Sequence, residues 1–214
     1  MSLSEILLKD VVYKRLKDRI VNGLMPFGMK ISEKMIADEF SISKTPVRDA
    51  IHMLVQEGLL IVKPQSGTFV INLDKKLIYD MMRFRSVIEC GCVDIIFQNG
   101  SQGVLGRYLE TINETMKIKI AEEDWDSYCI HDHQFHVSIV QMADNEHLRK
   151  SHDSVATLML AMLNQLGRKD KKGYSQKNVD EHREFTEYLL NNDQENAISM
   201  LKSHLDPSLK PYLL

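Results

Sequence analysis

Residues 43–58 read SKTPVRDAIHMLVQEG, and their apolar side chains recur at the spacing of an α-helix. The apolar face of this helix consists of Val47, Ala50, Ile51, Leu54 and Val55. Ser43 or Thr45 can cap the start, and Pro46 is tolerated there because N–H groups of the first turn have no partner within the helix. The opposite face carries Lys44, Thr45, Arg48 and His52. Cationic and hydroxyl groups at this end of a helix suit phosphates and base edges, so the segment is predicted to be a DNA recognition helix.

The sequence on either side of this helix is typical of a winged helix. Upstream, Ser32 can cap a short helix that runs to Phe40, and the connection at 41–42 leaves the spacing of a helix–turn–helix. Downstream, Gly58 ends the long helix and a β-hairpin follows. Its predicted parts are strands at 59–62 and 68–71 and a turn at 63–67. The alternative is a small α+β core with incidental surface charges, but the consistent order of caps, charges and hairpin favours the winged helix.

Five short motifs lie along this region in order. They are GLMPFG at 23–28, ISE at 31–33, SKTPVRDA at 43–50, EGL at 57–59 and SGTFV at 66–70. The set resembles the GntR family of bacterial transcription regulators over nearly all of residues 5–71. Asp49 stands where Glu is usual, and Phe27 separates a Pro and a Gly that are normally adjacent. The resemblance implies contacts with operator DNA from Lys34, Lys44, Thr45 and Arg48, and a wing tip at Ser66 and Gly67 near the minor groove.

Composition and charge are consistent with a DNA-binding domain joined to a second domain. The chain has 214 residues, of which 43% are hydrophobic and 27% charged, as in ordinary globular proteins of one or two domains. Residues 1–73 carry a net charge of +2, whereas the remainder carries −5. No apolar run approaches the ~20 residues that span a bilayer, and the charged N-terminus lacks the apolar core of a signal peptide. We therefore expect a cytoplasmic protein without a membrane segment.

The second module is predicted to be all-α. We place the domain boundary near 72–74, which gives a DNA-binding domain at 1–73 and an effector-sensing and dimerisation domain at 74–214. Glycine-rich loop signals occur at 99–103 and 167–173, with long stretches of helical periodicity between them. The predicted helices are 74–98, 102–122, 124–142, 146–167, 174–191 and 193–205. The expected fold is mainly α, a winged helix–turn–helix followed by an antiparallel helical bundle.

Four residues of the bundle can hold a metal ion. Asp132 and His136 are four apart and so share a helix face, while His182 and His204 lie in the last two helices. One carboxylate and three imidazoles suit a borderline divalent cation such as zinc or nickel. The alternative is that these histidines lie at the surface and that the Asp–His pair is only a hydrogen bond. Spacing alone leaves both interpretations open.

Dispersed motifs add to the evidence for a metal site. They are RxxIE at 85–89, DxxFH at 132–136, NxxL at 145–148, EH at 181–182 and LxxHL at 201–205. They resemble the FCD-type ligand-sensing domain of the FadR subfamily, many members of which hold a metal with one Asp and three His. The resemblance implies a site formed by Asp132, His136, His182 and His204. The other histidines of this region match no ligand position and are expected at the surface or around the ligands: His131, His133, His147 and His152.

The expected function is a bacterial transcription regulator whose operator affinity is set by a small organic acid. Four ligands can saturate zinc, but a metal of higher coordination leaves room for a carboxylate, which Arg85 can grip bidentately. Alternatively, Arg85 forms an ion pair with Glu89 on the same helix. A metal-responsive switch without an organic effector is a second possibility. A metal-dependent hydrolase is a third, but no general base or Gly-x-Ser-x-Gly motif accompanies the ligands, so no enzyme is expected.

Overall fold

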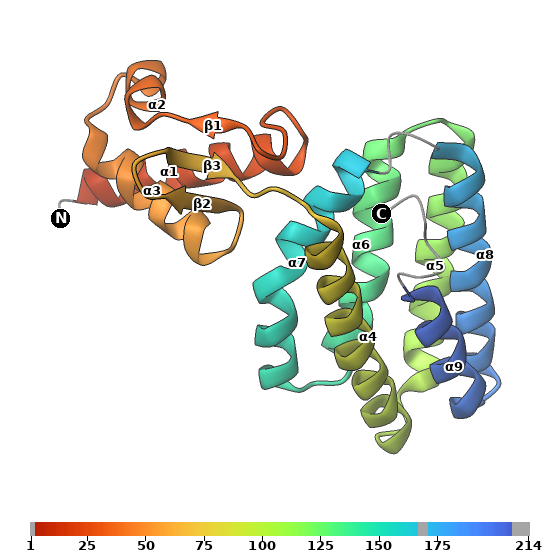
Figure 1. Ribbon diagram of the computed structural model, residues 1–214. Helices are drawn as coiled ribbons and strands as arrows, with labels where there is room; N and C mark the ends of the chain where they lie inside the picture. Colours follow the sequence, from red (N-terminus) through yellow and green to blue (C-terminus); the bar gives the residue numbers. More distant parts are fainter. Residues whose placement is uncertain (1–2, 167–170, 207–214) are drawn as a thin grey trace. The chain divides into compact units, whose positions relative to one another are not determined.

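The computed structural model describes residues 3–166 and 171–206, which form two compact units. Unit 1 is Met1–Leu73 and unit 2 is Asp74–Leu214. Unit 1 is a winged helix–turn–helix and unit 2 contains helices without strands in its described residues, which confirms the predicted fold class (Figure 1). None of the described helices combines the length and apolar character needed to cross a membrane.

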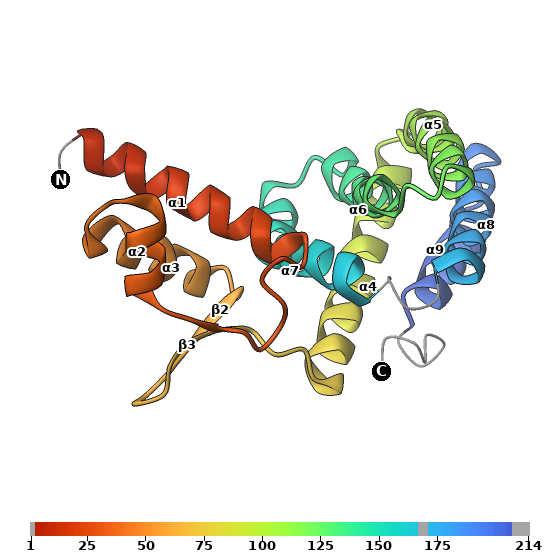
Figure 2. The ribbon, with the colours of Figure 1, turned by 90° about the horizontal axis from the view of Figure 1, so that it is seen from above.

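Unit 1 builds its core from three helices and a small sheet. The elements are α1 (Leu3–Val21), β1 (Lys30–Ile31), α2 (Glu33–Phe40), α3 (Lys44–Gln56), β2 (Leu60–Lys63) and β3 (Gly67–Val70). The strands pair antiparallel in the order β1-β3-β2. Helix α1 packs on α3 (Figure 2). Its Val12, Leu16 and Ile20 are fully buried. The predicted hairpin is confirmed, and α1 and β1 are additions to the predicted elements.

The helix–turn–helix is shaped by its caps. The Ser32 hydroxyl accepts a hydrogen bond from the Met35 N–H at 3.5 Å, as expected for the N-cap of α2. Ser41 ends α2 in the left-handed conformation (φ 55°), which turns the chain toward α3. Ser43 is the N-cap of α3 by position, but its side chain forms no capping hydrogen bond. Gly58, with φ 73°, lies just beyond the C-cap, where a left-handed residue lets the chain turn into β2.

Unit 2 is a helical bundle. Its helices are α4 (Lys75–Gln98), α5 (Gln102–Ala121), α6 (Trp125–Met142), α7 (Glu146–Leu166), α8 (Lys171–Leu190) and α9 (Gln194–His204). Most bounds agree with the predicted ones within a residue, but α8 begins three residues early. Gly173 therefore lies in a helix rather than in the predicted loop at 167–173, of which residues 167–170 lie outside the described residues. Evidently the surrounding helical sequence overrides one glycine.

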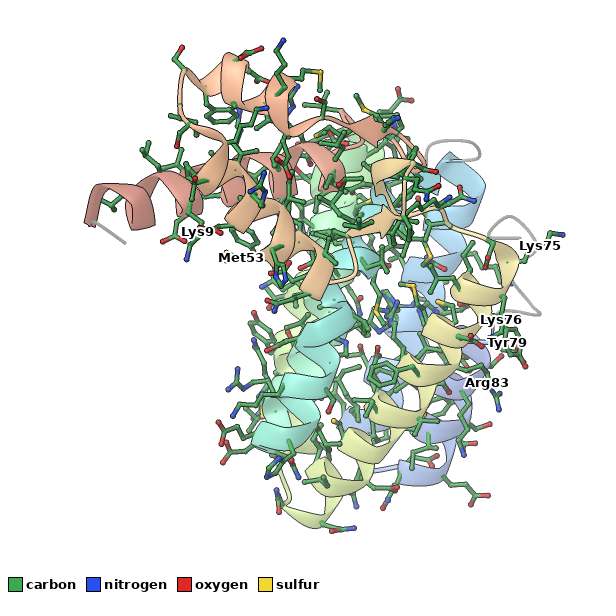
Figure 3. The ribbon with its side chains drawn as sticks, turned by 60° about the vertical axis from the view of Figure 1, so that its left-hand side comes forward. Lys9, Met53, Lys75, Lys76, Tyr79 and Arg83 are labelled. Atoms are coloured by element: carbon green, nitrogen blue, oxygen red, sulfur yellow. The ribbon has the colours of Figure 1, made fainter. Side chains whose placement is uncertain are left out.

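The bundle places α4, α6, α8 and α9 around a common interior. Helix α5 packs on α6 and α8, α9 packs on α4 and α8, and α7 packs on α6 and α4 (Figures 1 and 2). Helices α5 and α8 approach closely at Gly106, where an added Cβ would lie 2.8 Å from the Leu190 side chain. Helix α4 presents Lys76, Tyr79 and Arg83 outward (Figure 3), whereas its Arg85 and Glu89 are buried.

Candidate metal centre and nucleic-acid interface

Three imidazoles from three helices meet in the interior of unit 2. The Nε2 atoms of His136 (α6), His182 (α8) and His204 (α9) lie 3.1–3.3 Å from one another. All three side chains are buried, with relative exposures of 1–4%. The Oδ1 atom of Asp132, one turn before His136, lies 3.9 Å from Nε2 of His182. The structure thus brings the three predicted histidines together, and it places Asp132 next to one of them, His182.

Two of these imidazoles are oriented by carboxylates, which bind the Nδ1 side of the ring, away from the converging Nε2 atoms. Nδ1 of His136 is 2.7 Å from Oε2 of Glu89, and Nδ1 of His204 is 2.7 Å from Oε2 of Glu181. These contacts assign the ring proton to Nδ1 in each case, so that Nε2 presents its lone pair to the centre. Carboxylates behind histidines are a common feature of metal sites, where they fix the tautomer and raise ligand basicity. Sequence reasoning did not assign this role to Glu89 or Glu181.

Aromatic packing fixes the third imidazole. Phe135 stacks on the His182 ring with centroids 3.9 Å apart and an interplanar angle of 8°, and it meets His136 edge-on at 5.3 Å. Phe135 is itself fully buried. The ring positions are thus held by packing as well as by hydrogen bonds.

The three Nε2 atoms of His136, His182 and His204, called here the nitrogen triangle, are spaced to fit a divalent cation. Three nitrogens at ~2.0–2.1 Å from a tetrahedral zinc ion lie roughly 3.3–3.4 Å apart, close to the spacing seen here. Three converging imidazoles suit zinc or nickel, and Asp132, 3.9 Å from Nε2 of His182, is the nearby carboxylate of the predicted set.

Arg85 forms the ion pair that sequence reasoning had left open. Its Nε donates to Oε1 of Glu89 at 2.7 Å, and the two side chains are 5% and 0% exposed. Glu89 therefore joins Arg85 through one oxygen and His136 through the other. A buried guanidinium thus stands beside the carboxylate that orients a member of the nitrogen triangle.

The remaining histidines of the bundle occupy three different environments. His147 is exposed, and His131 is half-buried with Nδ1 2.7 Å from the Ser127 carbonyl oxygen. His133 is half-buried, and burial together with the Arg85 charge lowers its pKa to about 4. His152 is 1% exposed, with Nε2 3.9 Å from Oε1 of Glu89. His152 therefore lies next to the buried ion pair of Arg85 and Glu89.

The residues of unit 1 that are predicted to contact DNA are exposed. They comprise Lys34 on α2, Lys44, Thr45 and Arg48 on α3, and Ser66 and Gly67 at the tip of the hairpin. Arg48 is held by Glu33, with Nε 3.2 Å from Oε1 and Nη2 2.9 Å from Oε2. The guanidinium is thus already oriented by a neighbouring carboxylate at the N-terminal end of α3. This long-range pair was not predicted from the sequence.

The three-stranded sheet carries two further cations that sequence reasoning did not single out. Lys30 and Lys63 place their Nζ atoms 5.7 and 5.2 Å from the centre of the Phe69 ring. Both lysines are exposed and come from strands on either side of β3. Their convergence depends on the pairing of β1 with β3, which the sequence alone did not reveal. They add positive charge to the wing.

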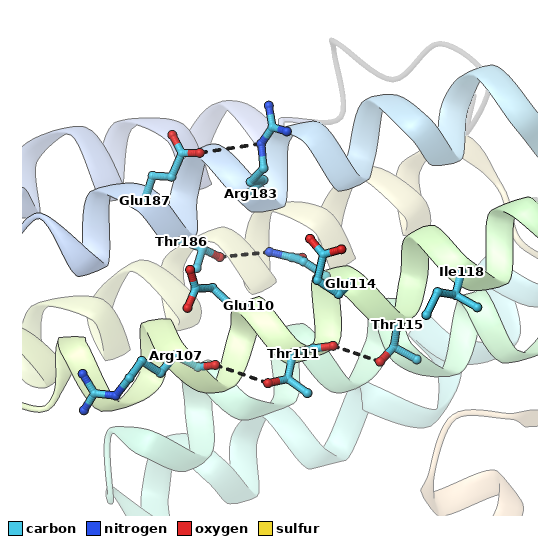
Figure 4. Close-up of a pocket in the computed structure, with 10 residues that line it drawn as sticks. Arg107, Glu110, Thr111, Glu114, Thr115, Ile118, Arg183, Thr186 and Glu187 are labelled. Carbon is cyan, nitrogen blue, oxygen red and sulfur yellow. Dashed lines mark hydrogen bonds and ion pairs between the residues drawn. The ribbon is translucent and has the colours of Figure 1, made fainter.

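A polar groove of about 580 Å³ lies elsewhere in unit 2, between α5 and α8 (Figure 4). Its charged lining residues are of both signs: Arg107, Arg183, Glu110, Glu114 and Glu187. Asn113, which also lines the groove, donates to Thr186 Oγ1 at 3.1 Å. None of the four predicted metal ligands lines this groove. It is therefore distinct from the nitrogen triangle.

Comparison with known proteins agrees with this architecture. Residues 8–70 match the model of the bacterial regulatory proteins of the gntR family, and residues 80–207 match the FCD domain. The gluconate operon transcriptional repressor of Bacillus subtilis is 27% identical over 194 residues, which cover 89% of this chain and 79% of that protein. A GntR regulator structure from Rhodococcus sp. RHA1 superposes with a TM-score of 0.80 at 22% identity, covering 96% and 97% of the two chains. E. coli McbR/YncC gives a TM-score of 0.74 at 20% identity and 96% coverage of both.

The winged helix and the helical domain together define a DNA-binding transcription regulator. The chain belongs to the GntR family, in the group that carries an FCD domain. It is a DNA-binding transcriptional regulator and not an enzyme, which removes the metal-dependent hydrolase from consideration.

Proposed function

We propose that this regulator adjusts its affinity for operator DNA in response to a small organic acid bound at a divalent metal ion, zinc or nickel. The ligands would be Asp132, His136, His182 and His204, and the protein would act as a homodimer. The observation that carries the proposal is the triangle of buried Nε2 atoms at 3.1–3.3 Å. Two of these rings are oriented by carboxylates, as metal-binding imidazoles commonly are.

The buried cation next to this centre supports an anionic effector. Arg85 donates to Glu89 through Nε. Among the described residues, Nε is the only Arg85 nitrogen that has a hydrogen-bond partner. A guanidinium has further N–H donors in a planar fork that matches a carboxylate. A metal of higher coordination can accept the same carboxylate as an additional ligand. The similar protein of Bacillus subtilis is named for an operon of gluconate, itself an organic acid.

A direct test separates this function from a switch that responds to metal alone. The metal-free protein is bound to its operator, and zinc or nickel is added with and without a panel of small mono- and dicarboxylates. A change in operator affinity that requires both metal and acid supports the proposal. The same change with metal alone would identify a metal-responsive regulator.

Lys44 and Arg48 are expected to contribute differently to operator binding. If Arg48 reads a base edge, Arg48→Ala should cost about 1–3 kcal/mol of binding free energy and relax sequence preference. If Lys44 holds a phosphate, Lys44→Ala should weaken all DNA binding and reduce the salt slope by ~1. Both are measured by fluorescence anisotropy on a palindromic operator over a salt series. Affinities equal to that of the unmodified protein at matched salt, in both variants, would refute this assignment.

Glu33 is expected to act as a positioning residue for Arg48. Glu33→Gln removes a negative charge beside the DNA-facing surface, so affinity for random DNA should rise, while Arg48 loses the partner that orients it. The ratio of operator to random-DNA affinity should therefore fall roughly tenfold. Glu39→Gln is the control, because Glu39 lies on the same helix and pairs instead with Arg19 at 2.9 Å. An unchanged ratio in Glu33→Gln would show that the pair does not position Arg48.

A further inference from the structure

His152 is a polar residue on the apolar face of a helix. Its neighbours on the buried side of α7 are Ala156, Met159 and Leu163, and its own side chain is 1% exposed. Neither ring nitrogen has a hydrogen-bond partner among the described residues. A buried imidazole without such a partner costs free energy that an apolar side chain at the same place would not. His152 is therefore a buried imidazole without a hydrogen bond among the described residues.

The surroundings of His152 are those of the proposed effector site. Its Nε2 is 3.9 Å from Oε1 of Glu89, the oxygen to which Arg85 donates at 2.7 Å. The other oxygen of Glu89 binds Nδ1 of His136. His152 and Arg85 thus meet at one carboxylate oxygen, directly behind a member of the nitrogen triangle. His152 therefore lies beside the cation that is proposed to hold the carboxylate of the acid.

The chemical state of His152 limits what it can bind. Burial lowers its pKa, and the Arg85 charge acts in the same direction against the opposing effect of Glu89. The ring is therefore neutral at neutral pH and offers one N–H donor and one acceptor nitrogen. A hydroxyl group can accept from such a ring or donate to it. A carboxylate only accepts, and the permanently charged Arg85 is the stronger partner for it.

We infer that His152 is a specificity-determining residue that hydrogen-bonds a hydroxyl group of the effector, so that the regulator selects hydroxy acids over acids without that hydroxyl. This inference rests on the proposed function, because it requires an organic acid at the metal. The carboxylate of the acid would occupy the metal and Arg85, and its hydroxyl would bind His152. The residue would thus add selectivity to a site whose affinity comes from charge.

The test compares acids that differ by one hydroxyl group on full-length, metal-loaded protein. Malate is paired with succinate and lactate with propionate, and each Kd is measured by calorimetry. In the unmodified protein, at least one hydroxy acid should bind roughly tenfold more tightly than its partner, the contribution of one added hydrogen bond. His152→Leu should reduce that preference to less than about twofold, and His152→Gln should restore part of it because an amide also donates and accepts.

Two readouts separate this role from a structural one. His152→Leu should keep its metal content and show an equal or higher melting temperature, since an apolar residue replaces a buried polar group. His147→Leu, on the exposed side of the same helix, should change neither preference nor metal content. Equal binding of both members of each pair, or a preference that survives in His152→Leu, would overturn the role of His152 alone. If no acid of the panel binds, the proposed function fails and this inference with it.

Discussion

His182→Ala is expected to purify without bound metal and to melt roughly 5–10 °C below the metal-loaded protein. His182 supplies one of three converging nitrogens, and its loss leaves an incomplete ligand set. A ligand that binds only the folded state adds ~2.7 kcal/mol to the free energy of unfolding when its concentration is a hundred times its Kd. For a chain of this length, that loss of stability corresponds to the expected shift in melting temperature. Elemental analysis and differential scanning fluorimetry measure the two effects.

His147→Ala provides the matched control for this experiment, because it removes an exposed imidazole from the same unit. His152 is unsuitable as that control, since its burial couples any substitution to stability. A chelator should lower the melting temperature of the unmodified protein and of His147→Ala, but not that of His182→Ala. Metal affinity should also fall on acidification, because protons compete for the ligand nitrogens. Equal metal content in His182→Ala and His147→Ala would mean that the site lies elsewhere.

The parts of this fold that were predictable from the sequence are those with local signals. Helical periodicity and punctuation by glycine and asparagine located α4 to α9, and caps and charges located α2 and α3. Helix α1 is long, but it was not among the elements predicted from the sequence. Strand β1 is two residues long and exists because Lys30 pairs with Phe69 and Ile31 with Thr68, a long-range register that local pattern does not encode.

The same distinction applies to the candidate site. Asp132 and His136 were found from their four-residue spacing, and the late histidines from their motifs. The carboxylate behind His136 was not found, because Glu89 lies 47 residues away in the chain and reaches the ring only through the packing of α4 on α6. In Arg85–Glu89, the i,i+4 spacing suggested an ion pair, but not that its carboxylate would also contact His136. Local spacing thus identifies candidate ligands, whereas their orienting partners require the fold.

The largest effect expected on regulation is the loss of the acid response in Arg85→Ala. In the metal-loaded protein, a suitable organic acid should change operator affinity 5–150-fold, which corresponds to a coupling of about 1–3 kcal/mol between the two sites. The acid can shift DNA affinity only if it binds the two states of the regulator with different affinity. Reciprocity then requires saturating operator DNA to change the affinity for the acid by the same factor.

Matched variants on α4 distinguish the role of the Arg85 fork from its charge. Arg85→Ala removes the guanidinium but leaves the buried Glu89 without its cation, so a lower melting temperature is expected along with the lost response. Arg85→Lys keeps a charge for Glu89 but lacks the bidentate fork, and it should retain stability better than acid binding. Arg83→Ala, which removes an outward-facing arginine of the same helix, should preserve both (Figure 3).

An acid that stabilises the bundle yet leaves operator affinity unchanged would refute the coupling. An acid that binds equally well without metal would show that the cation is structural and that recognition of the acid rests on Arg85 and its neighbours.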